Sequence, residues 1–481
     1  MTDNSFYWHD YETFGVDPRR DRAVQFAGVR TDFDFNIIEE PLVIYCKLTD
    51  DSLPQPEACV VTGITPQLAE EKGLCEAEFI RLIHQQLAVK GTCTLGYNNL
   101  RFDDEVTRNL LYRNFYDPYA REWQHGNSRW DLIDLVRTMY ALRPEGVRWP
   151  FNEEGKVSLR LDQLTIENGI VHEAAHDALS DVQATIALAK LIKQAQPKLF
   201  QFLLDNRGKK AVNDLLHLGS FKPVVHISGM YGADRHCLAV VLPLCKHPTN
   251  SNGVIVYDLS VSPEGMLNLS AEEIHTRLFT AKADLAEGLE RIPLKTIHIN
   301  KCPVVAPLNV LRAEDIMRLN IDIDSSQKNA SLIKNAVDLI DKIVDTFSIK
   351  PDFEAVTDPD LMIYSGGFFN PQDKALIDEI RSLNPTQLAQ YQVDSKDTRL
   401  PEMFFRYKAR NYPESLSKSE RDKWIEFCVS RLAGDSGNGF IGFSEYESKL
   451  SELKQQANYD VTLHDDLEAY AWSLKNKLQL G

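Results

Sequence analysis

The chain has 481 residues, of which 43% are hydrophobic, 9% aromatic and 26% charged. This balance is typical of a globular protein and excludes the fibrous and disordered classes. The formal net charge is −17, from 70 acidic and 53 basic residues. Taken alone, that charge argues against a nucleic-acid partner, because phosphate binding needs Lys and Arg. At about 150 residues per domain, the length predicts about three domains.

Other features of the sequence exclude further classes. The start, Met1-Thr-Asp-Asn-Ser5, is acidic and polar where a secretory signal would be basic and then apolar. No apolar run approaches the roughly 20 residues of a membrane helix. The 8 cysteines are scattered without a C-x-x-C pair. We therefore expect neither a disulfide framework nor a zinc cluster, and we expect a cytoplasmic location.

The first 200 residues alternate strand-like and helix-like patterns. Apolar runs bounded by turn residues predict strands, and apolar residues at helical spacing predict helices. In chain order these are strands at 6–10, 24–29 and 42–47, a helix at 77–87, a strand at 92–97, and helices at about 104–115, 132–141 and 181–194. Such alternation predicts an α/β domain built on a mixed sheet.

The pattern changes after residue 220. β-rich runs at 223–227, 238–244, 253–259 and 294–300 are separated by Gly, Pro and Asn, which predicts a small barrel or sheet domain. From about Ala313 onward helical patterns dominate. We interpret Pro351, Pro359, Pro371 and Pro385 as helix breakers in this last region.

Asp10-Tyr11-Glu12 is the first candidate functional motif. Alternate residues of a strand face the same side, so the two carboxylates project together. Paired carboxylate oxygens suit Mg²⁺ or Mn²⁺. The alternative is a solvated surface pair, but the apolar residues before Asp10 would place the acids at the mouth of a buried strand.

Asp103-Asp104-Glu105 is the second candidate motif. Asp103 lies where the predicted strand at 92–97 gives way to a helix. Acids at a helix start are favoured by the helix dipole, so simple N-terminal capping is the alternative. Three adjacent acids leave at least one carboxylate for another role.

His176 and Asp181 form the third candidate motif. The alternative is an ordinary loop histidine and an ordinary acid at a helix start. Functionally, a histidine five residues ahead of a metal-binding aspartate can overhang the metal, and with a pKa near 6.5 it can take a proton from water. His172 lies four residues further from Asp181, and we set it aside.

Together and in this order, the three motifs resemble the DEDDh pattern of the 3′→5′ exonuclease superfamily, with Asp10, Glu12, Asp103, His176 and Asp181 as its five residues. The resemblance is closer to bacterial exodeoxyribonuclease I enzymes, and it spans nearly the whole chain. The blocks that carry it are DYETFG at 10–15, VTGIT at 61–65, GYNNLRFDDEVTR at 96–108, YRNFYDPY at 112–119, SRWD at 128–131, HINKCP at 298–303 and ARNYP at 409–413.

The resemblance implies an overall architecture. It implies a ribonuclease H-like exonuclease domain with a mixed β-sheet at 1–200, an SH3-like β-barrel domain at 205–350 and a helical C-terminal domain at 351–481. Such proteins enclose a groove for single-stranded DNA in a C shape, which would explain processive digestion. We expect a monomer.

A mechanism follows from the charges of the five residues. Asp10, Glu12, Asp103 and Asp181 supply four negative charges that can hold two Mg²⁺ ions, with Mn²⁺ as a possible substitute. His176 would act as the catalytic base that takes a proton from the attacking water. The expected product is a nucleoside 5′-monophosphate, released in DNA repair and recombination.

Aromatic residues and arginines concentrate between the second and third motifs, and single-stranded DNA is gripped by aromatic stacking and by arginines along the phosphates. Several of the aromatics recur at helical spacing, which more often indicates core packing. We expect Tyr119, Trp123, Arg108 and Arg137 to contact the strand. The resemblance adds Thr13, Glu12 and Arg160, the last at the terminal nucleotide. The full run is Arg108, Tyr112, Arg113, Phe115, Tyr116, Tyr119, Trp123, Trp130, Arg137 and Arg143.

The resemblance also implies a protein partner. Family members bind the acidic C-terminal tail of single-stranded DNA-binding protein in a basic pocket. Lys222 and Arg312 are the candidates for that contact here, although an isolated basic residue is usually just solvated.

Three other functions are compatible with parts of the sequence. A 3′→5′ exoribonuclease would use the same five residues, since no local residue reads the 2′-hydroxyl. A non-catalytic single-stranded nucleic-acid scaffold is disfavoured by the complete set of five. A small-molecule metallophosphatase would not need the aromatic and arginine run.

The net charge can be reconciled with DNA binding. Residues 1–200 carry 21 basic against 31 acidic groups, whereas residues 201–350 carry 17 of each. A strand responds to the potential of its groove rather than to the average over the surface. We therefore expect a locally basic groove on an acidic exterior.

Overall fold

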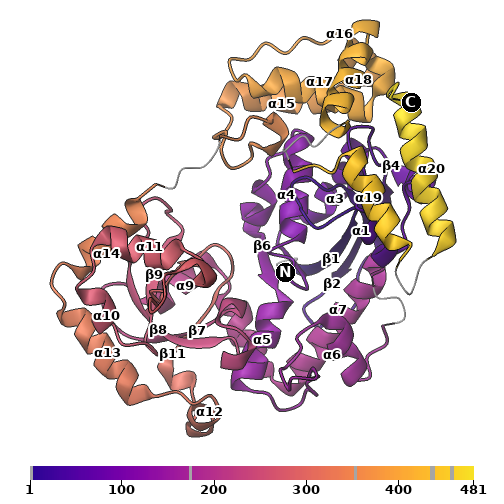
Figure 1. Ribbon diagram of the computed structural model, residues 1–481. Helices are drawn as coiled ribbons and strands as arrows, with labels where there is room; N and C mark the ends of the chain where they lie inside the picture. Colours follow the sequence, from indigo (N-terminus) through magenta and orange to yellow (C-terminus); the bar gives the residue numbers. More distant parts are fainter. Residues whose placement is uncertain (1–3, 173–175, 351–354, 434–438, 456–459, 481) are drawn as a thin grey trace. The chain divides into compact units, whose positions relative to one another are not determined.

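The computed structural model describes residues 4–172, 176–350, 355–433, 439–455 and 460–480. The chain divides into two compact units (Figure 1). The first unit comprises Met1–Ser128, His172–Ile186 and Ala355–Gly481, and the second comprises Arg129–Val171 and Ala187–Glu354. Among the helices in the described ranges, none is both long and apolar enough to span a bilayer.

A six-stranded sheet carries the N-terminal region, and its strand order is β4-β3-β2-β1-β5-β6. β1 pairs antiparallel with β2 and parallel with β5, which confirms the predicted mixed sheet. β1 and β2 are almost entirely buried, as expected for central strands covered on both faces. The strands are β1 (Ser5–Thr13), β2 (Ala23–Thr31), β3 (Leu42–Cys46), β4 (Gly73–Leu74), β5 (Thr92–Gly96) and β6 (Ser128–Asp131).

Helices α3 and α4 cover one face of this sheet. Phe79 and Ile80 of α3 and Leu110 of α4 share a core with Tyr7 and Tyr11, which lie on the same side of β1. The neighbouring helices α1 and α2 are separated by Gly63, whose φ of +69° suits glycine. The helices are α1 (Pro56–Thr62), α2 (Pro66–Lys72), α3 (Glu76–Leu87), α4 (Asp103–Arg113) and α7 (Ala178–Ala195).

The C-terminal region of the first unit is helical, as predicted. Its prolines begin elements rather than break them: Pro359, Pro371 and Pro385 are each the first residue of a helix. The interpretation of these prolines as breakers was therefore wrong, because proline fits the first helical turn, where its missing N–H is not needed. Pro351 lies outside the described residues. The helices are η7 (Pro359–Leu361), α15 (Pro371–Ser382), α16 (Pro385–Gln390), α17 (Arg399–Asn411), α18 (Lys418–Leu432), α19 (Phe443–Leu453) and α20 (Val461–Lys477).

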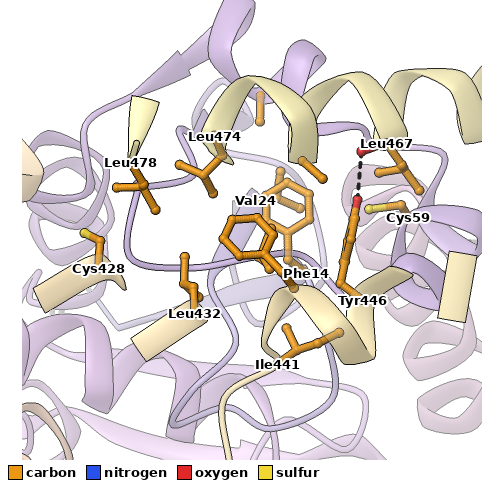
Figure 2. Packing of buried hydrophobic residues seen from close by; sticks show 14 of the residues in the cluster. Phe14, Val24, Cys59, Cys428, Leu432, Ile441, Tyr446, Leu467, Leu474 and Leu478 are labelled. Carbon is orange, nitrogen blue, oxygen red and sulfur yellow. Dashed lines mark hydrogen bonds between the residues drawn. The ribbon is translucent and has the colours of Figure 1, made fainter. Parts of the chain in front are cut away.

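These C-terminal helices share a core with the first strands of the chain. Figure 2 shows Phe14 and Val24 packed among residues of α18, α19 and α20, including Leu432 and Leu474. Tyr446 lies in the same core, and its hydroxyl donates to the carbonyl oxygen of Leu467 over 3.1 Å. The two ends of the sequence thus build one core.

A buried charge network lies at the same junction. Asp51, which is fully buried, accepts hydrogen bonds from Arg22 at 3.1 Å and from Arg410 and Arg431 at 2.8 Å. Asp360 also accepts from Arg410. Arg410 belongs to the ARNYP block at 409–413. The arginine of this block therefore joins the C-terminal helices to the N-terminal region.

The second unit contains an antiparallel five-stranded sheet of order β10-β9-β8-β7-β11, the SH3-like domain. Val241, Val256 and Ile297 lie in its core together with Val212 and Leu216 of α9. The strands are β7 (Val224–Ile227), β8 (Leu238–Lys246), β9 (Gly253–Asp258), β10 (Leu294–His298) and β11 (Val304–Pro307). The helices are α5 (Leu132–Leu142), α6 (Leu161–Glu167), α8 (Pro197–Asn206), α9 (Lys209–Leu216), α10 (Glu264–Leu267), α11 (Ala271–Phe279), α12 (Ala313–Arg318), α13 (Ile323–Asn335) and α14 (Leu339–Ser348).

Candidate active site

Asp10 and Glu12 lie at the C-terminal end of β1, on the same side of the strand. The pairing of β1 with β5 ends at Trp8, opposite Leu95. The edge of β1 beyond Trp8 therefore leaves its backbone groups available to side chains. The N–H of Tyr11, between the two acids, donates to Oδ1 of Asp103 over 3.1 Å.

Asp103 is the first residue of α4 and is 3% exposed. Its backbone oxygen accepts from the Thr107 hydroxyl over 2.8 Å, as in an ordinary helix turn. Its carboxylate instead reaches across to β1. The capping alternative for Asp103 is thus not what its side chain does here.

Asp181 completes the cluster from α7. Carboxylate oxygens of Asp10, Glu12 and Asp181 all lie within 4.8 Å of one another. The helix begins at Ala178, so Asp181 lies in its first turn rather than at its start. Oδ1 of Asp181 is 2.5 Å from Nε2 of His172. The contact of His172 with Asp181 was not predicted, because spacing along the chain does not show which histidine lies against the carboxylate.

The carboxylates raise one another's pKa. Burial, followed by the charges of Asp103, Glu12 and Asp181, raises the pKa of Asp10 well above its ordinary value. Burial and the charge of Asp181 raise the pKa of Glu12 to about 8. The pKa of Asp181 is raised by burial, although its contact with His172 works in the opposite direction.

This donor set fits a divalent cation. Clustered and buried carboxylates repel one another unless a positive charge lies between them, and their oxygens are the ligands that Mg²⁺ and Mn²⁺ prefer. Asp10, Glu12 and Asp181, with Asp103 beside them, are the residues that could hold such ions.

His176 is exposed and lies in the turn before α7. Its φ of +67° is uncommon for a residue with a side chain. The charge and backbone of His176 both act to lower the pKa of Asp181, so His176 is close to that carboxylate. The residues just before it, 173–175, lie outside the described part of the chain.

Arg108 is buried and paired rather than open to a strand. It forms ion pairs with Glu105 at 2.6 Å and Glu122 at 2.7 Å, and it is 5% exposed. Its guanidinium carbon lies 5.4 Å from the ring centroid of Tyr119. The charge of Arg108 thus offsets two carboxylates beneath Tyr119, which spacing along the sequence could not reveal.

An exposed aromatic patch, formed by Tyr119, Tyr364 and Phe368, lies beside the start of α4. The ring of Tyr119 is 6.5 Å from that of Tyr364 and 6.2 Å from that of Phe368. Tyr364 is 55% exposed and Phe368 is 86% exposed. The Tyr364 hydroxyl donates to Glu105, two residues after Asp103. Tyr364 and Phe368 were not predicted as part of the site, although aromatics beside the paired glycines at 366–367 could have indicated them.

The other aromatics of the run divide as the core-packing alternative predicts. Tyr112 and Phe115 lie in a core with residues of the C-terminal helices. Tyr116 is partly buried against the core under α3 and α4. Trp130 is buried and packs against Phe200. Trp123, by contrast, is 66% exposed.

The remaining candidates for strand contact occupy varied environments. Thr13 is buried, and its hydroxyl donates to the carbonyl oxygen of Gly15 over 2.6 Å. Arg160 is exposed and pairs with Asp162 at 3.0 Å. Arg137 is half-buried and pairs with Asp134 at 2.7 Å.

Arg312 belongs to a cluster of three arginines around the buried Asp315. Asp315 pairs with Arg312 at 3.0 Å, with Arg143 at 3.1 Å and with Arg318 at 3.4 Å. Arg312 also pairs with Glu314 at 2.7 Å and with Glu145 at 3.4 Å, so three carboxylates lie among the three guanidinium groups. Lys222 is exposed just before β7. No sequence signal joined Arg143 to Arg312, because these two residues lie far apart along the chain.

Comparison with known proteins agrees with this arrangement. Family models match in three segments: "Exonuclease" at residues 7–189, "Exonuclease I SH3-like domain" at 207–349 and "Exonuclease I C-terminal domain" at 357–474. Exodeoxyribonuclease I of Haemophilus influenzae is 45% identical over 96% of this chain and 99% of its own length. Exodeoxyribonuclease I of Escherichia coli is 47% identical over 88% of this chain and 89% of its own.

Solved structures give the same result. Exonuclease I from Methylocaldum szegediense has a TM-score of 0.94 and 50% identity, covering 98% of this chain and 99% of its own. E. coli exonuclease I in complex with a dA16 oligonucleotide has a TM-score of 0.93 and 44% identity, covering 98% of this chain and 100% of its own. With the carboxylate cluster and the fold in place, the chain belongs to the exodeoxyribonuclease I family.

Proposed function

We propose that this protein is a 3′→5′ exodeoxyribonuclease that hydrolyses single-stranded DNA processively to nucleoside 5′-monophosphates, in DNA repair and recombination. The observation that carries the proposal is the convergence of Asp10, Glu12 and Asp181 within 4.8 Å, with Asp103 hydrogen-bonded beside them. The similar E. coli structure with a dA16 oligonucleotide supports DNA as the substrate.

The four carboxylates would hold two divalent ions, for which Mg²⁺ is the proposed metal and Mn²⁺ a substitute. Bound ions of this kind stabilise the charge that develops on the phosphate and the leaving oxygen. A zinc-bound form of the E. coli enzyme with single-stranded DNA supports a divalent metal at such a site.

Each residue of this chain then has a defined task. The Tyr11 N–H orients the carboxylate of Asp103. His172 orients that of Asp181. His176 takes the proton from the attacking water, for which an exposed imidazole is suited.

The aromatic patch and Trp123 are the proposed stacking surface for the bases. Arg108 would act indirectly there, because it neutralises Glu105 and Glu122 and so removes repulsion of the phosphates. Thr13, Arg137 and Arg160 remain proposed contacts.

A protein partner is proposed at the arginine cluster. A solved structure with 43% sequence identity is described as SSB/Exonuclease I in complex with the inhibitor CFAM, which supports such a partner. We propose that the acidic tail of that partner binds at Arg143, Arg312 and Arg318, with Lys222 as a further contact. The proposed segments are an exonuclease domain at 1–200, an SH3-like domain at 205–350 and a helical domain at 351–481.

Digestion of 5′-labelled oligonucleotides tests the function. With Mg²⁺, the single-stranded DNA should shorten stepwise from its 3′ end, while duplex DNA and a matched RNA should persist. EDTA and the variant Asp10→Asn should each abolish turnover. Preferential digestion of RNA would instead favour the exoribonuclease alternative, and metal-dependent cleavage by Asp10→Asn would contradict the assigned site.

A further inference from the structure

Gln25 links the central sheet to the loop that carries His176. It lies on β2 directly opposite Glu12 of β1 and is 1% exposed. Its amide nitrogen donates to Oδ1 of Asp177 over 3.1 Å, and its amide oxygen accepts from the N–H of Ala178 over 3.3 Å. Both ends of one buried amide therefore hold the segment that immediately follows His176.

Asp177 passes this restraint on to α7. Its Oδ2 accepts from the N–H of Ser180 over 3.1 Å, and its backbone oxygen accepts from the N–H of Asp181 over 3.0 Å. A continuous chain of hydrogen bonds thus runs from Gln25 through Asp177 to the first turn of the helix that carries Asp181. This arrangement fixes where α7 begins relative to β1 and β2.

The same contacts fix His176. A histidine at φ +67° lies in a sparsely populated backbone region and persists only where its neighbours restrain it. The next residue is Asp177, and its carboxylate accepts the hydrogen bond from Gln25. Loss of this hydrogen bond would let the turn change its conformation, although the carboxylates of the cluster and the imidazole of His176 would all still be present.

We propose that Gln25 is a positioning residue for the reaction: it acts through Asp177 to hold His176 over the carboxylate cluster. This inference rests on the role proposed above for His176. A displacement of about 1 Å in a reacting group can cost about 100-fold in rate, so the effect should appear in kcat.

The polarity of the Gln25–Asp177 contact allows a rescue experiment. Gln25→Glu places two carboxylates against each other. In Asp177→Asn, one carboxylate oxygen becomes an NH₂ group. That group must face another donor, either the amide nitrogen of Gln25 or the N–H of Ser180. In the double variant Gln25→Glu/Asp177→Asn the donor and acceptor exchange places. The carboxylate introduced on β2 would accept from the new amide and from the N–H of Ala178, and every group is satisfied again.

We expect each single variant to lower kcat about 10- to 100-fold, and the double variant to recover to within about threefold of the wild type. KM for single-stranded DNA and the Mg²⁺ concentration at half-maximal rate should change little in all three. A matched control is Tyr45→Phe, which removes only the hydroxyl that the Gln25 amide also reaches, at 3.0 Å, and should leave kcat nearly unchanged.

Two outcomes would overturn the proposal: a double variant no faster than the single variants, or losses that appear in KM and not in kcat. Should the double variant fail to fold, Gln25→Ala, Asp177→Ala and their combination replace it. Adding Gln25→Ala to Asp177→Ala should then lower kcat by less than about a further twofold. If the two losses in kcat multiplied instead, the inference would be contradicted. His176→Ala is assayed in parallel: wild-type kcat in that variant would refute the proposed base itself, whereas slow His176→Ala with unaffected Gln25 variants would refute only the role of Gln25.

Discussion

The imidazole of His172 lies against the carboxylate of Asp181, with 2.5 Å between Nε2 and Oδ1. The side chain of His172 is 4% exposed, whereas His176 is exposed. Two histidines thus lie near Asp181, a proposed metal ligand, in different environments. A buried imidazole in contact with a ligand orients that ligand, and an exposed one is available to exchange protons with water.

Replacement of each histidine by alanine should separate these roles. For His176→Ala we expect kcat to fall about 10²- to 10⁴-fold, with the Mg²⁺ requirement unchanged. For His172→Ala we expect the Mg²⁺ concentration at half-maximal rate to rise about 10- to 100-fold, because the orienting contact on Asp181 is lost. Steady-state rates over a Mg²⁺ titration measure both. Equal effects of the two variants on metal dependence would contradict the assignment.

The raised pKa of Glu12 should make the metal-free protein less stable at higher pH. The Glu12 carboxyl titrates near 4.5 when unperturbed and at about 8 in the folded protein. Between these values the folded state binds more protons than the unfolded state, so this contribution to stability declines as pH rises, by up to about 1.4 kcal/mol per pH unit. Glu12→Gln lacks it.

Urea unfolding in EDTA between pH 5 and 8 tests this expectation. The stability of Glu12→Gln relative to wild type should increase steadily across that range. Added Mg²⁺ should reverse the trend, because metal binding requires the ionised carboxylate. Parallel stability curves in EDTA would show that Glu12 is not perturbed in this way.

Asp51 should be essential for stability although it is far from the chemistry along the chain. Asp51→Asn removes the charge that three buried arginines share, and loss of one partner in such a network costs about 3–5 kcal/mol. The neighbouring Asp50 pairs with Lys477, whose side chain is 64% exposed. Asp50→Asn is therefore a matched control that should cost less than about 1 kcal/mol. Chemical denaturation compares the two.

Phe368 should contribute to DNA affinity. Stacking on one aromatic ring is worth about 1–3 kcal/mol per base, so Phe368→Ala should raise Kd for a dT oligomer about 5- to 150-fold. Fluorescence anisotropy in EDTA measures this without digestion. Trp472, which is 70% exposed on α20, provides a control of similar exposure, and Trp472→Ala should leave Kd unchanged. If both variants bound equally well, the patch would not be a stacking surface.

The parts of the fold that follow local rules could be predicted from the sequence. The apolar runs at 6–10 and 24–29 indicated β1 and β2, and helical spacing indicated α3 and α4, within three residues at each end. The short helices α1 and α2 were not predicted, because seven residues do not establish a period. β11 was missed for the same reason: it is four residues long and ends in a proline.

The candidate site shows a similar division. The clustered acids could be predicted because they lie at the end of a strand or in the first turn of a helix, and because the motifs resemble a known family. Contacts between residues remote in sequence could not. Glu122 neutralises Arg108 across 14 positions, and Tyr364 reaches Glu105 across 259. Only folding brings such partners together.

The shared core of the two chain ends has a consequence during synthesis. Phe14 and Val24 are made early, but the residues of α20 that cover them, including Leu467 and Leu474, are among the last. At about 5–20 residues per second, the ribosome needs on the order of 20 to 90 s to supply them. Throughout that interval the nascent chain exposes apolar surface that the C-terminal helices complete only at the end, so the growing polypeptide should depend on chaperones until translation is nearly complete.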